Sequence, residues 1–101
     1  MKSFARLSRT EYLILDLLQD ENRFGLELVE RSRGALKRGT VYVTLARMQD
    51  KGYVSSRTEA LAPGAIGLPR RLYRPTAYGL KVFRVWSRAE RALARLRPQE
   101  A

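Results

Sequence analysis

The sequence of 101 residues contains no cysteine and no histidine. It therefore has no disulfide, no thiolate zinc ligand and no imidazole base. We find no other acid–base or nucleophile pattern, and we expect neither an enzyme nor a metal or cofactor site. No apolar run approaches the roughly 20 residues that a membrane-spanning helix needs, and we expect no membrane partner.

The N-terminal residues Met1-Lys2-Ser3-Phe4 lack the apolar stretch of a secretory signal. A cytoplasmic protein is therefore the expectation. The length allows one domain. A chain this short buries a limited share of its surface, so any long apolar helix left over needs a partner.

What the chain has in excess is positive charge. Twenty Lys and Arg against ten Asp and Glu give a net charge of +10, and sixteen of the twenty are arginine. Such a surplus attracts polyanions, and the guanidinium group matches phosphates and guanine edges better than an ammonium does. The alternatives are an arginine-rich solvated surface and an anionic membrane.

Three helices are predicted in the first half of the chain. Ser8 and Glu11 form a capping box for the first, in which Ile14, Leu17 and Leu18 share one face. The second helix covers about residues 25–32 and is stopped by Gly34. The third covers roughly residues 40–51, followed by Gly52 as its C-terminal glycine.

The second half predicts a hairpin and a final helix. Extended runs at residues 53–57 and 71–74 flank a Gly/Pro-rich loop. Pro75 ends the second run or places it at a sheet edge. Thr76 can then cap a helix over about residues 77–97.

This order of elements is that of a winged helix. The expected fold is α+β and mostly helical, a winged helix-turn-helix with a two-stranded wing and a C-terminal dimerisation helix. Residues 1–76 would form the DNA-binding domain, and residues 77–101 the dimerisation helix and tail.

The third helix has two distinct faces. Val41, Leu45 and Met48 recur at helical spacing and should face the core. The other face is narrow enough for a major groove about 12 Å wide, where its methyl groups can meet thymine and its arginine a guanine or a phosphate. The alternative is an ordinary solvated surface. The residues of this candidate DNA face are Thr40, Val43, Thr44 and Arg47.

Further basic residues surround this helix. Lys37 and Arg38 precede it and are placed to meet phosphates. A loop flanked by arginines suits a wing that follows a phosphate ridge or probes a minor groove. The alternative is an edge strand protected by charge. The arginines at the base of the hairpin are Arg57, Arg70, Arg71 and Arg74.

Four blocks resemble the PadR family of regulators over about residues 10–80, in the right order and spacing. Val43, Phe24 and Pro75 depart from the family's usual proline, histidine and aliphatic residue, so the operator sequence cannot be read by analogy. The blocks are Phe24-Gly25-Leu26-Glu27-Leu28, Gly39-Thr40-Val41-Tyr42-Val43-Thr44-Leu45, Asp50-Lys51-Gly52-Tyr53-Val54 and Arg70-Arg71-Leu72-Tyr73-Arg74-Pro75-Thr76-Ala77-Tyr78-Gly79.

The resemblance implies a homodimer that represses transcription, with the last helix forming the dimer. Tyr42 would match the family's groove-side tyrosine, and its alternative is a half-buried packing residue. The other matching positions are Gly39, Thr40 and Leu45 in the recognition block, and Tyr73, Thr76 and Gly79 in the block that leaves the wing.

The last helix is too apolar for the surface of a monomer, and a two-fold partner would bury its stripe. Trp86 is expected there as a packing residue; its alternative is stacking on a planar ligand, as in some PadR-like regulators, and nothing else indicates an effector pocket. The expected dimer residues are Leu80, Phe83, Trp86, Leu93 and Leu96. A second stripe, read either as a solvated face or as a contact for DNA or an acidic partner, consists of Lys81, Arg84, Arg88, Arg91 and Arg95.

The sequence therefore predicts a sequence-specific regulator that binds double-stranded DNA as a homodimer. The alternative is a winged-helix adaptor that binds RNA or an acidic protein partner. The operator, the regulated genes and the direction of regulation are not encoded in any pattern that we can read.

Overall fold

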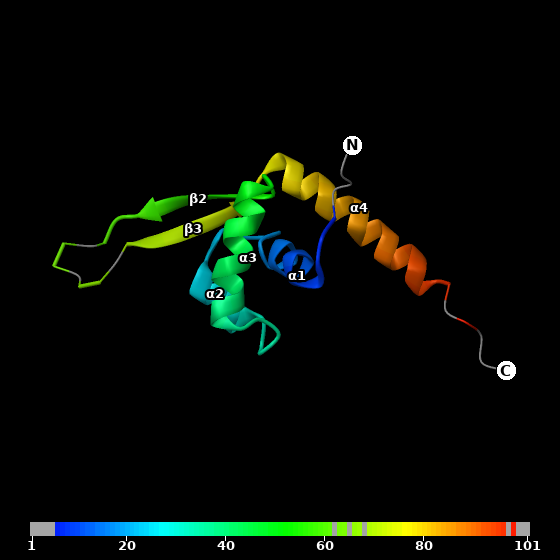
Figure 1. Ribbon diagram of the computed structural model, residues 1–101, viewed down its shortest axis with the longest axis horizontal. Coiled ribbons are helices and arrows are strands. Elements are labelled where there is room, and N and C mark those ends of the chain that lie inside the picture. The colour runs from blue at the N-terminus through cyan, green and yellow to red at the C-terminus, as the bar shows by residue number, and fades with distance from the viewer. Residues whose placement is uncertain (1–5, 62, 65, 68, 97, 99–101) are drawn as a thin grey trace.

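The computed structural model describes residues 6–61, 63–64, 66–67, 69–96 and 98. Four helices and three strands follow one another along the chain (Figure 1). They are α1 (Arg9–Leu17), β1 (Arg23–Phe24), α2 (Gly25–Arg31), α3 (Arg38–Asp50), β2 (Val54–Glu59), β3 (Arg70–Pro75) and α4 (Ala77–Ala94).

The predicted helices are confirmed, with small shifts at their ends. Glu11 accepts a hydrogen bond from the Ser8 N–H at 2.8 Å, and the Glu11 N–H donates to the Ser8 hydroxyl at 3.1 Å, which is the expected capping box. Helix α3 begins two residues earlier than predicted, because Arg38 already belongs to its first turn and Lys37 is the N-cap. Gly52 follows its last turn with a φ of +82°, in the left-handed region that glycine favours.

The sheet has three strands, whereas the sequence predicted only the two of the wing. The order is β1-β3-β2, and both neighbours of β3 are antiparallel to it. Strand β1 pairs Arg23 with Tyr73 and Phe24 with Leu72. Two residues are too few to show an alternating pattern, which is why β1 could not be recognised in the sequence.

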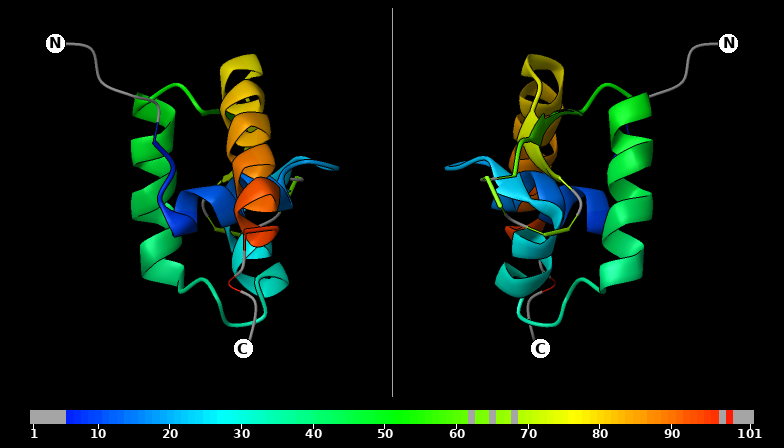
Figure 2. Two further views of the ribbon diagram at one scale, coloured as in Figure 1. Left: turned by 90° about the vertical axis from the view of Figure 1, so that its right-hand side faces the viewer. Right: turned by 90° about the vertical axis from the view of Figure 1, so that its left-hand side faces the viewer.

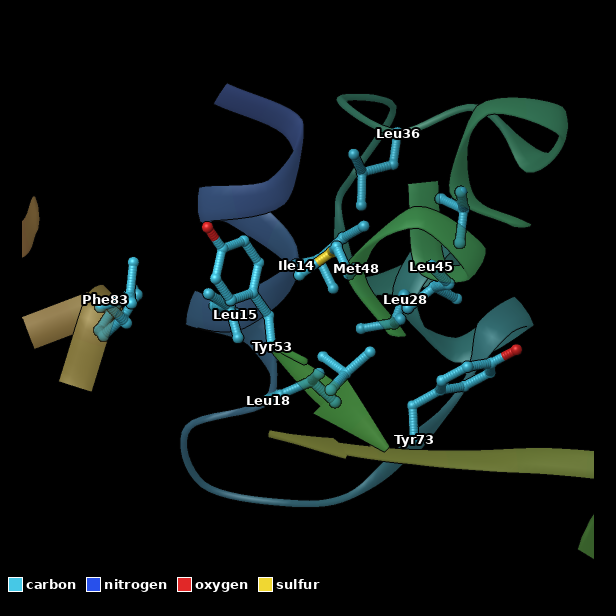
Figure 3. Close-up of a cluster of buried hydrophobic side chains, with 13 residues drawn as sticks. Ile14, Leu15, Leu18, Leu28, Leu36, Leu45, Met48, Tyr53, Tyr73 and Phe83 are labelled. Carbon is cyan, nitrogen blue, oxygen red and sulfur yellow. The ribbon is translucent and has the colours of Figure 1, made fainter. Parts of the chain in front are cut away.

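The core lies where α1, α2 and α3 pack against the base of the wing (Figure 3). Val41, Leu45 and Met48 are fully buried, as predicted for the inner face of α3. Val82 and Phe83 of α4 belong to the same core, and the Phe83 ring stacks on Tyr12 at 4.9 Å between centroids. The first half of α4 is therefore part of the folded domain.

One buried carboxylate anchors the end of α3. The Glu11 side chain is only 5% exposed, and its Oε2 lies 2.7 Å from Lys51 Nζ. Burial raises the pKa of Glu11, but the hydrogen bonds and charge of Lys51 and the bonds to Ser8 outweigh burial, and the net pKa is lowered. The pair therefore joins the start of α1 to the end of α3 in its ionised form.

The start of α4 is fixed against the residue that leads into the wing. Thr76 accepts the Gly79 N–H at 2.9 Å as a helix cap, and its own N–H donates to the Tyr53 carbonyl at 3.0 Å. A Cβ on Gly79 would lie 2.0 Å from that carbonyl oxygen. Only a glycine allows the first turn of α4 to lie this close to the backbone of Tyr53.

The wing and the end of α4 project from opposite sides of the body (Figure 1). Helix α1 lies between α3 and α4 and contacts both, so that α3 and α4 lie on opposite sides of the molecule (Figure 2). The outer surfaces of these two helices are thus separate and can be occupied at the same time.

Candidate nucleic-acid interface

The outer face of α3 is open to solvent. Thr40 and Arg47 are exposed, Val43 is 53% exposed and Thr44 is half-buried. All four predicted residues therefore share one accessible face on the side away from Val41 and its neighbours in the core. The face combines small side chains with one arginine, which is the shape and chemistry that a major groove admits.

Tyr42 is partly packed and partly exposed, so it lies between the two alternatives considered for it in the sequence. It is 43% exposed, yet one side of its ring covers Gly25 at the start of α2. A Cβ on Gly25 would lie 2.5 Å from the ring, so the glycine leaves the space that the ring occupies. Tyr42 is thus held in place by α2 while part of its ring stays accessible.

The N-terminus of α3 carries the positive charges. Lys37 and Arg38 are both exposed, no acidic residue is present in the first turn, and no side chain in the described part of the chain caps the helix. Cations at this end oppose the helix dipole, and the free amides favour an anion there. No side chain among the described residues balances this arrangement, but a phosphate group would.

The register of the hairpin divides the four wing arginines between its two faces. Paired residues of an antiparallel sheet point to the same side, and neighbours along a strand point to opposite sides. Arg71 therefore shares a face with Tyr73 and Ser56, and this face looks towards α3. The other three arginines, Arg57, Arg70 and Arg74, lie on the opposite face together with Leu72.

A short hydrogen-bond chain fixes Arg71 relative to α3. Ser56 donates to Gln49 Oε1 of α3 at 3.0 Å, and Arg71 Nη1 donates to Ser56 Oγ at 3.1 Å. Arg71 is thus exposed, and Ser56, which is itself bonded to α3, orients its guanidinium group. Among the wing arginines, Arg71 is the one that the structure connects to α3.

The arginines of the opposite face have partners of their own. Arg70 lies over the Phe24 ring at 4.1 Å, and Arg74 Nε donates to Ser55 Oγ at 3.0 Å. Arg57 forms an ion pair with Glu59 at 3.2 Å. These contacts are all solvent-accessible, so each arginine keeps donors for another ligand.

The sequence matches one protein family over most of its length. A family model described as "Transcriptional regulator PadR-like family" matches residues 14–85. The chain belongs to this family. The match begins in the buried part of α1, includes α3 and the whole wing, and ends in α4. No curated protein sequence matches the chain significantly.

Solved PadR structures share this fold. A PadR family regulator from Clostridium difficile has a TM-score of 0.76 and 24% identity, over 88% of this chain and 94% of that one. A PadR family regulator from Eggerthella lenta has a TM-score of 0.69 and 26% identity, over 82% of this chain and 72% of that one.

One further neighbour is a DNA complex. Bacillus subtilis PadR, solved in complex with operator DNA, has a TM-score of 0.72 and 19% identity. The match covers 96% of the present chain and 51% of that protein, so this chain spans about half its length. At this identity the likeness shows the shared fold.

The structure shows a role for each of the three residues that match the PadR pattern at the exit from the wing. Tyr73 is buried in the core, and Thr76 caps α4 and also donates to the Gly52 carbonyl. Gly79 permits the contact with Tyr53. Thr76 and Gly79 thus fix the start of α4, and Tyr73 belongs to the core beside it.

The predicted dimer residues differ in how exposed they are. Phe83 is only 8% exposed because it packs in the core of its own chain, and it offers little surface to a partner. Leu80 and Trp86 are half-buried. Leu93 and Leu96 are 64% and 74% exposed, and Val85, at 64%, joins them. Of the predicted dimer residues, the two nearest the C-terminus of α4, Leu93 and Leu96, therefore offer the most exposed apolar surface.

The basic stripe of α4 is exposed throughout. Its five residues recur at spacings of three and four and lie beside the apolar stripe without interrupting it. In the described part of the chain no helix is long and apolar enough to cross a membrane, and no cluster of acidic side chains is suited to a metal ion.

A pocket that the sequence did not indicate lies between α1 and α4. It has a volume of about 540 Å³ and is lined by Tyr12, Leu13, Leu36 and Trp86, with Asp16 and Glu90 among its polar residues. The apolar side of the pocket adjoins the exposed half of α4. No pattern in the sequence pairs Tyr12 with Trp86, because they come from helices that are far apart in the chain.

Proposed function

We propose that the protein is a cytoplasmic repressor that binds double-stranded DNA sequence-specifically as a homodimer. The observation that carries the proposal is the common orientation of two surfaces. The outer face of α3 is small and accessible, and Arg71 of the wing is held on the same side by the chain through Ser56 and Gln49. The DNA-bound neighbour from Bacillus subtilis supports the choice of ligand.

In this proposal α3 enters the major groove. Arg47 forms two hydrogen bonds with a guanine edge, and Val43 and the threonine methyl groups contact thymine. Lys37, Arg38 and Arg71 contact phosphates, which position the protein without reading sequence. Tyr42, held against Gly25, contributes its exposed edge to the same groove.

The second copy of the chain covers the outer half of α4. Val85, Leu93 and Leu96 expose apolar surface, and the pocket beside Trp86 provides a groove next to them. A two-fold dimer through this stripe can present two α3 helices about 34–36 Å apart, one turn of DNA. Because α3 and α4 lie on opposite sides of α1, the dimer leaves both DNA surfaces free.

A selection from random duplex DNA tests the proposal. We expect the enriched sequences to contain two inverted half-sites about one helical turn apart, because the two subunits are related by symmetry. Competition by unrelated duplex and by structured RNA should be weak. Equal binding to RNA and DNA without an enriched motif would instead indicate the adaptor function.

Repression is tested separately by transcription in vitro. With the selected site placed across a promoter, added protein should reduce transcript yield at the concentration that occupies the site. A rise in yield would assign activation and would leave the DNA-binding proposal intact.

A further inference from the structure

The tip of the wing differs in composition from the rest of this basic protein. The ten residues from Ala60 to Pro69 include no charged side chain, although the chain as a whole carries a net charge of +10. Ala62, Ala65 and Leu68 lie outside the described residues. Among those described, Ile66 is 99% exposed, the highest value among the exposed large apolar residues.

This exposure is unfavourable for the free protein. Removing an isoleucine side chain from water stabilises a protein, and the exposed Ile66 gains almost none of this stabilisation in the single chain. Gly64 and Gly67, on either side of Ile66 in the sequence, have φ values of +83° and +123°, in the region that glycine favours. The described part of the chain therefore gives Ile66 almost no apolar contact, and another molecule could supply one.

The hairpin is charged along its stem and apolar at its tip, and this order indicates what kind of molecule would contact Ile66. The stem carries four arginines, and the apolar tip lies beyond them. A minor groove has the matching order, with anionic phosphates at its rims and sugar and base edges inside. An acidic protein surface would match the stem but would meet an uncharged tip.

We propose that Ile66 is a specificity-determining residue that contacts the floor of the minor groove and selects A·T pairs there. The inference rests on the proposed DNA binding and adds a second reading site to the face of α3. Ile66 makes the apolar contact, and Arg71, on the face directed towards α3, contacts a rim phosphate.

The selection has a simple physical origin. In the minor groove a G·C pair differs from an A·T pair by the 2-amino group of guanine, which projects from the floor. An isoleucine side chain cannot accept its hydrogen bond, so covering that group removes its water without replacement. The floor of an A·T pair has no such donor.

Modified bases test this directly, because they change the minor groove and leave the major-groove edges as they are. In the selected duplex, 2,6-diaminopurine replaces adenine one position at a time and adds a 2-amino group. We expect one short stretch outside the α3 contacts where this weakens binding about tenfold, as for one unsatisfied donor. A hypoxanthine·cytosine pair in place of an A·T pair there, which has no amino group in the minor groove, should be tolerated, whereas a G·C pair should not.

Variants of the wing tip test whether Ile66 causes the sensitivity to diaminopurine in that stretch. Ile66→Ser should bind the same diaminopurine duplexes and the unmodified duplex with nearly equal affinity, whereas Ile66→Val should keep the wild-type discrimination. Ala60→Ser, in the same uncharged segment but directly after β2, is the matched control and should keep it too. Because Ile66 is almost fully exposed, none of these changes should alter the melting temperature.

The outcomes separate this inference from the proposed function. If no duplex is enriched in the selection, DNA binding itself is wrong. If a duplex is enriched but Ile66→Ser keeps the full sensitivity to diaminopurine, or if no position is sensitive, then the minor-groove role of Ile66 is wrong and the proposed function stands.

Discussion

The helices α3 and α4 are built alike on the inside and differently on the outside. Each buries one face, Val41, Leu45 and Met48 in α3 and Gly79, Val82 and Phe83 in α4, and the apolar residues of both faces belong to one core. The outer face of α3 is small and polar around Arg47. The outer face of α4 has apolar side chains at Val85, Leu93 and Leu96.

The buried faces of the two helices build one core, and their outer faces differ in the kind of partner that they suit. A polar face with small side chains can approach base edges, whereas an apolar face at the same spacing gains free energy only by being covered. The first-turn glycines repeat the contrast. Gly79 of α4 is forced against the Tyr53 carbonyl, whereas a Cβ on Gly39 of α3 would meet open space.

The largest expected effect comes from exchanging these glycines for alanine. Gly79→Ala should destabilise the protein by about 3 kcal/mol, because the new methyl group can be accommodated only by moving α4 away from backbone. Gly39→Ala should instead stabilise it by about 0.5–1 kcal/mol, as alanine does within a helix. Denaturant unfolding of both variants checks this; equal effects would contradict the close contact at Gly79.

The inner face of α3 was predictable from the sequence because Val41, Leu45 and Met48 repeat at a helical period, whereas the short inner face of α4 was not. The capping box at Ser8 and the glycine stops were predictable too, since they involve residues close in the chain. Strand β1 was not, because two residues at Arg23 and Phe24 carry no period. Their pairing with β3 is a contact between segments about fifty residues apart.

The candidate site was predictable in its membership but not in its arrangement. All of the basic residues named from the sequence are exposed, yet the separation of Arg71 from Arg74 depends on the register of the hairpin. Phe83 was placed at the dimer surface because its spacing fits the apolar stripe. It is instead buried against Tyr12 of α1, and this contact cannot be predicted from the sequence of the last helix alone.

The outer face of α4 is tested by adding charge. Leu93→Glu together with Leu96→Glu should convert the dimer to monomers, because both side chains would be buried in the interface and an unpaired carboxylate there is costly. Arg91→Glu, on the basic stripe of the same turn, should leave the dimer intact. Sedimentation of the three proteins at micromolar concentration provides the measurement, and a wild-type monomer would contradict the proposed dimer.

The outer face of α3 is tested at Arg47. A bidentate contact with guanine discriminates against other bases by about 1–3 kcal/mol, so Arg47→Ala should lose about that much on the selected duplex and less on random DNA. Thermal unfolding should be nearly unchanged, because the side chain is exposed. The assignment fails if folded Arg47→Ala and Thr44→Ala both keep the wild-type sequence preference.

The anchor of α3 should respond to pH. The pKa of Glu11 is lowered from its ordinary value of 4.5 in the folded chain, so its contribution is present at neutral pH and is lost as the pH falls through and below that range. Glu11→Gln keeps the shape and an acceptor for the Ser8 N–H but removes the charge. We expect it to cost about 1 kcal/mol at pH 7, with the difference shrinking in acid. A difference that grows in acid would contradict the lowered pKa.

The smallest expected effect distinguishes the two faces of the wing. Arg71 lies on the face directed towards α3 and is oriented through Ser56, whereas Arg74 lies on the opposite face and bonds to Ser55. If Arg71 contacts one phosphate, Arg71→Ala should reduce the slope of log affinity against log salt by about 0.9 per subunit. It should weaken selected and random duplexes alike, because phosphates carry no sequence information.

Arg74→Ala is the matched control, since it removes the same charge from the same strand, and its slope should stay near that of the wild type. Equal slopes for the two variants would mean that the wing enters the groove edge-on and uses both faces, and the distinction that we draw from the register would then be lost.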